Sequence, residues 1–292
     1  MDEFDLKSTP ERRILDLRVL GIRDVPVIGH YTYRRAAQGL QRETHSEHFE
    51  VTFLTKGVQI YETEGERTVL RGGDLYLTRP GESHSTAGQP EEKGEAYWIF
   101  IRAVPGGSFL RFDAEAVSAF RSIFETGRRS ARASAELQEH LNKLFELHET
   151  HQSNPLAKAA LMARVDLLVL ELAACFTREV KDDIGGAVGR VLERLKRDDQ
   201  WDVSIAELAQ EARLSEARFK VRFKQEVGIP PGEYLMRRRI EKAKLWLRKT
   251  QYRIADIAKE LAFPTSQYFA TVFKRYTGKT PQDWRVPKKG DP

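Results

Sequence analysis

Two stretches near the end of the sequence carry side chains of the types that contact DNA bases. Glutamine can bind adenine through two hydrogen bonds, alanine and threonine can contact the thymine methyl group, and lysine and arginine can reach guanine or phosphate. The candidates are Ala217, Arg218, Lys220, Val221, Arg222 and Lys224 in the first stretch, and Thr265, Ser266, Gln267, Ala270, Thr271, Lys274 and Arg275 in the second. Ordinary solvated helix faces can have the same composition, so the elements that carry these residues decide between the two interpretations.

Both stretches belong to an internal repeat. The segment 205–209, Ile-Ala-Glu-Leu-Ala, recurs at 254–258 as Ile-Ala-Asp-Ile-Ala, an offset of 49 residues. A second set of positions recurs at an offset of 50, where Phe223, Gly228, Pro231 and Tyr234 correspond to Phe273, Gly278, Pro281 and Trp284. The sequence therefore predicts a duplicated structural unit with one extra residue inside its second copy.

Each copy has the pattern of a helix-turn-helix. In the first copy, Ser204 and Glu207 have the spacing of a capping box that opens a short helix. Ser215 is a suitable N-cap for a second, longer helix that ends before a Gly-Ile-Pro-Pro sequence. Phe219 and Phe223 lie four residues apart on that helix and would face the short one. A short helix, a tight turn and a longer helix form the DNA-binding motif whose second helix enters the major groove.

The segment 234–250 connects the two copies. Its apolar residues Ile240, Ala243, Trp246 and Leu247 form a helical stripe, and basic residues occupy much of the rest. We therefore predict a long helix that holds the two recognition helices at a fixed separation. Successive major grooves on one face of DNA lie ~34 Å apart, and a rigid spacer of this kind suits that distance.

Charge is distributed unevenly along the 292 residues. The whole chain has a net charge of +5, but residues 184–292 carry 24 Lys and Arg against 14 Asp and Glu, a net charge of +10. The remainder, 1–183, carries 24 basic and 29 acidic residues, a net charge of −5. A basic domain on an acidic remainder is typical of a protein whose one domain binds a polyanion, although a basic solvated surface is the simpler alternative.

Cysteine content and hydropathy narrow the class of protein. The single Cys175 excludes a disulfide-stabilised secreted fold. We expect no signal peptide, because the first 13 residues are charged and lack an apolar stretch. The apolar stretch 165–176 is too short for a membrane span and contains two acidic residues. Together these features predict a cytoplasmic protein.

The first 110 or so residues have the pattern of a β domain, and the next 70 that of helices. Short apolar runs at 51–53, 58–61 and 75–77 alternate with turn signals such as Gly72-Gly73-Asp74, which predicts a barrel or sandwich. Two helical stripes follow, at Leu137, Leu141, Leu144 and His148 and at Leu161, Val165, Leu168, Leu172 and Cys175. They predict a helical hairpin whose stripes pack on their own domain or form a dimer seam. The polar, Gly-rich segment 181–186 is a predicted linker.

The C-terminal segment resembles the DNA-binding domain of AraC/XylS-type transcription regulators over about 100 residues. The matching positions include Ile205, Leu208, Ser215, Phe219, Phe223, Gly228, Pro231, Arg239, Ile240, Ala243, Leu247, Ile254, Ile257, Phe263, Tyr268, Phe269, Phe273, Gly278, Pro281 and Trp284. The resemblance adds Ser215 and Arg239 to the predicted DNA-binding residues. Two turn positions that are usually glycine in the family are Arg213 and Ala262 here, so we expect differently shaped turns. Val221 stands where the family often has arginine, so base contact there is expected to be apolar or to shift to neighbouring cations.

The N-terminal segment resembles a cupin barrel. Glu50 followed by Gly57, and Gly73-Asp74 followed by Pro80-Gly81 and His84, match its two motifs. Enzymatic cupins hold Fe, Mn, Ni or Zn with a His-x-His pair, a glutamate and a later histidine. The positions six and four before Glu50 are Thr44 and Ser46, and the displaced His45 and His48 need not point toward a ligand position because side chains alternate along a strand. We therefore expect no metal and no cofactor.

Sensor cupins of AraC-type regulators commonly bind small molecules, often sugars. A sugar site needs an aromatic platform and polar hydrogen-bonding groups. The candidates are Tyr33, Arg35, His45, His48, Glu50, Tyr61, His84 and Trp98.

The resemblances predict a multidomain α+β protein. A cupin-like, jelly-roll-like sensor barrel with an N-terminal arm spans 1–112, and a helical hairpin at 113–180 is a candidate dimerisation element. A linker at 181–186 leads to an all-α DNA-binding domain with two helix-turn-helix units at 187–292.

The function implied is that of a transcription regulator, an activator rather than an enzyme, that responds to a sugar or sugar derivative. Its implied partners are promoter DNA, a second copy of the chain and RNA polymerase, in the bacterial cytoplasm and at the nucleoid when bound to DNA. Two alternatives stay open. One is a metal-dependent cupin enzyme fused to a DNA-binding module, with the metal at His45, His48, Glu50 and His84. The other is a DNA-binding dimer that needs no ligand.

Overall fold

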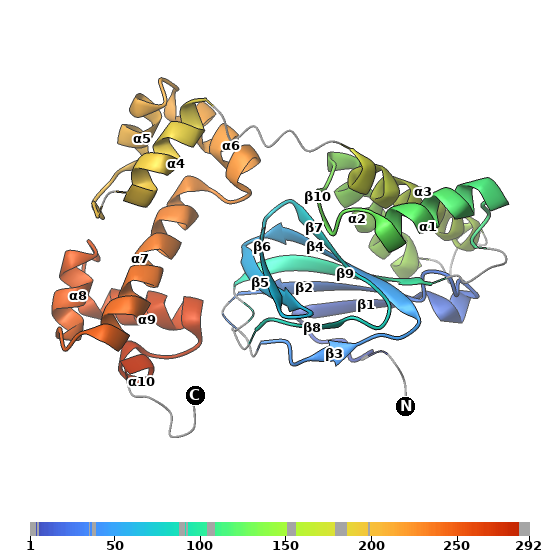
Figure 1. Ribbon diagram of the computed structural model, residues 1–292, viewed down its shortest axis with the longest axis horizontal. Coiled ribbons are helices and arrows are strands. Elements are labelled where there is room, and N and C mark those ends of the chain that lie inside the picture. Colours follow the sequence, from blue (N-terminus) through green and yellow to red (C-terminus); the bar gives the residue numbers. More distant parts are fainter. Residues whose placement is uncertain are drawn as a thin grey trace. The chain divides into compact units, whose positions relative to one another are not determined.

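The computed structural model describes residues 4, 6–34, 36, 39–87, 91, 93–103, 109–150, 156–178, 186–197 and 199–285. The chain divides into two compact units, one formed by 1–32, 40–88 and 94–180 and the other by 33–39, 89–93 and 181–292 (Figure 1). Over the described residues, the first contains the strands and three α-helices, and the second contains seven α-helices. The predicted mixed α+β class is confirmed. The predicted linker lies outside the described residues except for Gly186.

The strands of the first unit form two sheets. The six-stranded sheet has the order β1 (Arg12–Asp16), β2 (Val27–Tyr33), β9 (Gly94–Arg102), β4 (His48–Lys56), β7 (Asp74–Thr78) and β10 (Ser130–Arg132). The four-stranded sheet has the order β3 (Glu43–Thr44), β8 (Ser83–Ser85), β5 (Val58–Thr63) and β6 (Glu66–Arg71). A short 3-10 helix, η1 (Leu17–Leu20), follows β1. Over the described residues the sheets do not join into one closed barrel, so the predicted barrel is a two-sheet structure.

The central strands of the large sheet are buried on both faces. Because side chains alternate along a strand, Tyr97, Ile99 and Ile101 of β9 point one way and Trp98 and Phe100 the other. The first three share a core with helices α1 (Ala114–Thr126), α2 (Ala135–Thr150) and α3 (Ala157–Thr177). Residues of the opposite face pack toward the small sheet, where Leu54 and Tyr76 contact Tyr61 and Leu70. The space between the two sheets is therefore lined by alternate residues of β4, β7 and β9.

The predicted helical hairpin is present as α2 and α3, which pack against each other. Every apolar residue of its two predicted stripes is buried and belongs to the same core as the sheet, including Cys175. Burial also raises the pKa of the Cys175 thiol. The interpretation of these stripes as a dimer seam is therefore wrong, because the residues are already covered within their own unit. The outward side of α3 still exposes Leu167 and Leu170 by about half, at 46% and 50%.

The second unit contains two groups of three helices connected by one long helix. The first group consists of α4 (Ala187–Arg197), α5 (Ile205–Glu211) and α6 (Glu216–Val227). The second consists of α8 (Ile254–Glu260), α9 (Ser266–Thr277) and α10 (Pro281–Arg285). The connecting helix α7 (Pro231–Lys249) packs against α6 and against all three helices of the second group. None of the helices in the described part combines the length and the apolarity that a membrane span requires.

Capping residues account for the ends of several helices in this unit. Ser204 and Glu207 form the predicted capping box, with the Ser204 hydroxyl accepting from the Glu207 backbone N–H and the Glu207 carboxylate accepting from the Ser204 N–H. Ser215 and Thr265 cap α6 and α9 through their side-chain oxygens. Gly228 and Gly278 end these two helices in the left-handed conformation, which glycine adopts without steric cost.

The two helix-to-helix turns keep a left-handed residue although neither has glycine. Arg213 and Ala262 both have φ of 55°, and Leu214 and Phe263 donate backbone hydrogen bonds of 2.9 Å to Ala209 and Ala258. The expectation of differently shaped turns is therefore wrong. The backbone bonds of the turn impose the conformation in spite of its steric cost of roughly 1 kcal/mol or more for a non-glycine residue.

This strain predicts that Ala262→Gly stabilises the protein. Glycine removes the steric cost at φ 55° but loses more backbone entropy on folding, so we expect a net gain of about 0.5–1 kcal/mol in the free energy of unfolding. Urea unfolding measures it. The control is Ala255→Gly, the same substitution on the exposed side of α8, which should lower stability by a similar amount. If both variants are destabilised alike, the left-handed turn is not strained.

Candidate nucleic-acid interface and polar cluster

Helix α6 has one buried apolar side, and its opposite side is exposed to solvent. Phe219 and Phe223 are fully buried, and the positions half a turn away are exposed. These are Ala217, Arg218, Val221, Lys224 and Gln225. Val221 is 59% exposed, a large exposure for a branched apolar residue, which fits a contact with an apolar group such as a thymine methyl. Gln225 was not among the predicted residues, although its spacing of four from Val221 places it on the same side.

The cations of α6 differ in their partners. Lys220 pairs with Glu216 and Arg222 pairs with Glu226, each across one helical turn. Arg218 and Lys224 are exposed and make no ion pair with any residue the structure describes. Exposed pairs of this kind contribute only about 0–1 kcal/mol, so Lys220 and Arg222 can exchange partners. Arg218 and Lys224 need no exchange and are the cations of α6 best prepared for an external anion.

The corresponding side of α9 is polar. Phe269 and Phe273 are fully buried, and the residues opposite them are Gln267, Thr271, Lys274 and Arg275, all exposed. Thr265 caps the helix by accepting from the Tyr268 N–H at 3.0 Å. Ser266 and Ala270 flank this side and are half-buried. The second copy thus repeats the arrangement of the first, with Gln267 in the first turn of its helix.

Arg239 has a structural role in this chain. Its Nη2 and Nε donate to the Trp201 carbonyl at 2.7 and 3.1 Å, and burial lowers the pKa of its guanidinium. The side chain is half-buried and holds the segment before α5 against α7. This bond gives Arg239 a role within the helical unit, and its contact with DNA stays a prediction. Its partner is a backbone carbonyl 38 residues away, which helical spacing cannot reveal.

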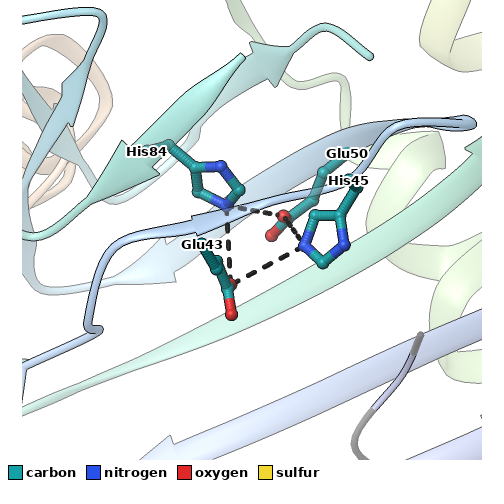
Figure 2. A group of neighbouring side chains, drawn as sticks. All are labelled: Glu43, His45, Glu50 and His84. Carbon is teal, nitrogen blue, oxygen red and sulfur yellow. Dashed lines mark ion pairs between the residues drawn. The ribbon is translucent and has the colours of Figure 1, made fainter. Parts of the chain in front are cut away.

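Four polar side chains of the first unit converge between β3, β4 and β8 (Figure 2). His84 Nε2 lies 3.0 Å from Glu50 Oε2 and 3.5 Å from Glu43 Oε1. His45 Nε2 lies 3.5 Å from Glu50 Oε2 and 3.8 Å from Glu43 Oε1. We call Glu43, His45, Glu50 and His84 the polar cluster.

Burial and opposite charge act against each other within the polar cluster. Burial alone would lower the pKa of His84, but the carboxylates of Glu43 and Glu50 outweigh it and raise the pKa to about 10. Burial alone would raise the pKa of Glu43, but the imidazoles of His45 and His84 lower it to about 2. The cluster therefore favours an ionised Glu43 carboxylate beside a protonated His84.

The structure brings three of the eight predicted ligand residues, His45, Glu50 and His84, into this cluster and places four others outside it. His48 packs against Phe4, with ring centroids 5.0 Å apart. Tyr61 and Trp98 lie in the apolar clusters between the sheets, and the Tyr33 hydroxyl donates to Glu91 at 2.7 Å. Arg35 lies outside the described residues.

Glu43 is the member of the cluster that the sequence prediction missed. The expected ligand positions were six and four residues before Glu50, whereas Glu43 and His45 lie seven and five before it. Residues two apart on an extended chain point to the same side, so the pair Glu43 and His45 was a detectable signal. The prediction that displaced histidines need not face Glu50 holds for His48, which packs on Phe4, but not for His45.

Comparisons with known proteins agree with this division into two units. Residues 26–165 match the family described as an AraC-like ligand binding domain, and residues 208–286 match a helix-turn-helix domain family. The arabinose operon regulatory protein of Salmonella typhimurium is 27% identical over 239 residues, which cover 79% of this chain and 81% of that protein. The HTH-type transcriptional activator RhaR of Yersinia pseudotuberculosis is 35% identical over 96 residues, which cover 30% of this chain and 33% of that protein.

Among solved structures, the C-terminal domain of the two-component response regulator yesN from Fusobacterium nucleatum is 31% identical. The matched region covers 34% of this chain and 98% of that domain, with a TM-score of 0.33. The two family matches together span most of the sequence, and each falls on the unit with the corresponding architecture. The chain therefore belongs to the AraC family of transcription regulators, with an AraC-like ligand-binding domain ahead of its helix-turn-helix domain.

Proposed function

We propose that this protein is a sequence-specific activator of transcription that binds promoter DNA through α6 and α9. The observation that carries the proposal is the pair of capped helices, each with an exposed polar side opposite two buried phenylalanines. Helix α7 supports it, because its 19 residues span roughly 28 Å, close to the ~34 Å between successive major grooves. The net charge of +10 on residues 184–292 favours the same polyanionic partner.

We propose further that the first unit binds a sugar or sugar derivative between its two sheets. The buried indole N–H of Trp98 and the buried ring nitrogens of His45 and His84 make no hydrogen bond within the described structure, and buried polar groups are normally satisfied. One relative is named an arabinose operon regulatory protein and another a transcriptional activator. These names support a sugar-responsive activator. We propose in addition that it acts without catalysis, as a homodimer in contact with RNA polymerase, which are the roles that the family resemblance implies.

DNA binding by this surface should depend steeply on salt. A protein that neutralises about 6–10 phosphates loses about 10³–10⁵-fold in affinity between 50 and 200 mM salt. Fluorescence anisotropy of the full chain with labelled duplex DNA at a series of salt concentrations measures this slope. A slope near zero, or no binding at low salt, would remove the DNA-binding proposal.

Effector binding is tested by thermal unfolding in a panel of sugars and metabolites. A compound present at 100 times its Kd should stabilise the first unit by about 2.7 kcal/mol and should change the affinity for promoter DNA in parallel. If no compound shifts the melting temperature while DNA binding is intact, the ligand-independent DNA-binding dimer is the better description. The alternative of a metal-dependent enzyme requires His48 as a metal ligand. The His48 ring packs on Phe4 instead, which does not support that alternative.

A further inference from the structure

We propose that the polar cluster of the first unit is a binding site for one divalent transition-metal ion. The proposal goes beyond DNA and effector binding, because it concerns a resident ion. It shares His45 and His84 with the proposed effector site, but its test measures metal content and needs no effector. The ligands assigned are Oε1 of Glu43, Nε2 of His45, Oε2 of Glu50 and Nε2 of His84.

The distances between these atoms match those of a coordination shell. All four ligand atoms lie within 4.8 Å of one another, and the four nitrogen–oxygen distances range from 3.0 to 3.8 Å. Four ligands placed about 2.1 Å from a central ion in a tetrahedron are roughly 3.4 Å apart. An ion can therefore be placed among them with small side-chain movements.

The buried members of the cluster form ion pairs with one another but make no hydrogen bond of acceptable geometry with a described residue. The His84 side chain is 0% exposed, and neither of its ring nitrogens makes a hydrogen bond of acceptable geometry with a described residue. The same holds for both ring nitrogens of His45 and for Oε2 of Glu50. Such atoms are costly to leave unsatisfied in a buried site. A metal ion would satisfy one nitrogen of each ring and the carboxylate oxygen together.

The fold positions these ligands independently of any ion. Glu43 of β3 is the register partner of His84 of β8, so their side chains emerge from neighbouring positions on one sheet. Glu50 reaches them from β4 of the other sheet (Figure 2). The His45 ring lies edge-on to Phe100 with 4.6 Å between centroids, which fixes its orientation. Ligands held in this way form a preorganised site.

The donor types select the class of metal. Two imidazoles with two carboxylates suit Zn²⁺, Mn²⁺, Fe²⁺ or Ni²⁺, whereas Mg²⁺ and Ca²⁺ prefer oxygen ligands alone. The two carboxylates also neutralise a divalent charge. The Glu43 side chain is 42% exposed, so the ion has a route from solvent and room for a further ligand.

Metal analysis of the untagged full-length chain tests the proposal. The protein is stripped with a chelator, incubated with Zn²⁺ or Mn²⁺, separated from free ions by gel filtration, and its metal content is measured by mass spectrometry. We expect about one ion per chain. Loading with Co²⁺ should also produce visible absorption bands, which report nitrogen and oxygen ligands directly.

Two nearly isosteric variants and one control make the assignment specific. Glu43→Gln and Glu50→Gln should each weaken metal affinity by about 100-fold or more, because each removes a charged ligand. His48→Ala changes another buried histidine that packs on Phe4 outside the cluster, and it should bind metal as the unaltered protein does. Circular dichroism of each variant confirms folding. Less than about a tenth of an ion per chain, or equal binding by the glutamine variants, would overturn the proposal.

Discussion

We expect Phe273→Ala to destabilise the second helix-turn-helix by about 3–5 kcal/mol. The Phe273 side chain is fully buried and packs against Phe269 and Trp284, with ring centroids 5.6 and 5.7 Å apart. Removing the ring leaves a cavity at the point where α9 meets α7, α8 and α10. Because the cost is a large part of a typical domain's stability, α9 should no longer be held in place at physiological temperature.

Urea unfolding followed by circular dichroism and tryptophan fluorescence measures this loss. The transition of the helical unit should move to lower urea while that of the first unit stays in place, since the two units have separate cores. The control is Thr271→Ala, an exposed residue of the same helix, for which a change within about 0.5 kcal/mol is expected. A loss of less than about 1 kcal/mol in Phe273→Ala would show that this core does not depend on its aromatic pair.

The second large effect is expected from reversing the charge of Arg218. Arg218 is exposed on the open side of α6 and has no ion-pair partner among the described residues. Arg218→Glu should lower affinity for promoter DNA by about 100-fold, because a good arginine contact contributes about 1–3 kcal/mol and a carboxylate there repels phosphate. The stability of the protein should change little, since no internal contact is lost.

Fluorescence anisotropy at fixed salt gives this change in Kd. Lys158→Glu is the matched control, because Lys158 is an exposed lysine on α3 of the first unit and its reversal alters the net charge by the same amount. It should leave DNA affinity within about two-fold, because Lys158 belongs to the unit that does not carry the α6 surface. Equal losses in both variants would mean that total charge, and not the α6 surface, determines binding.

The helical unit was predictable because its signals are local. The capping box at Ser204, the N-caps Ser215 and Thr265 and the glycines that end α6 and α9 each act within one helical turn. The exposed sides of both recognition helices follow from the spacing of their phenylalanines. Helix α4 was not predicted, although Val188, Val191 and Leu195 are buried at helical spacing.

Features that depend on distant partners were harder to predict. Strand β10 joins the sheet only through its pairing with β7, about 55 residues earlier. Arg239 was assigned to DNA from the family resemblance, and its bond to the Trp201 carbonyl could not be predicted because that partner comes from a separate segment. His48 and Glu50 point to the same side of β4, yet only Glu50 joins the polar cluster, because Phe4 packs on the His48 ring. The spacing of Glu43 and His45 could place both on one side of an extended segment, but their approach to His84 follows only from the pairing of β3 with β8.

Selection of binding sites from random duplex DNA with the full-length chain is the most direct test of the central claim. The proposed geometry of α6, α7 and α9 predicts two short motifs whose centres lie about 10–10.5 base pairs apart. Gln267→Ala should relax the preference in only one of them, because Gln267 belongs to α9 alone. Recovery of no motif, or of a single motif that Gln267→Ala leaves unchanged, would contradict DNA recognition by two helix-turn-helix units.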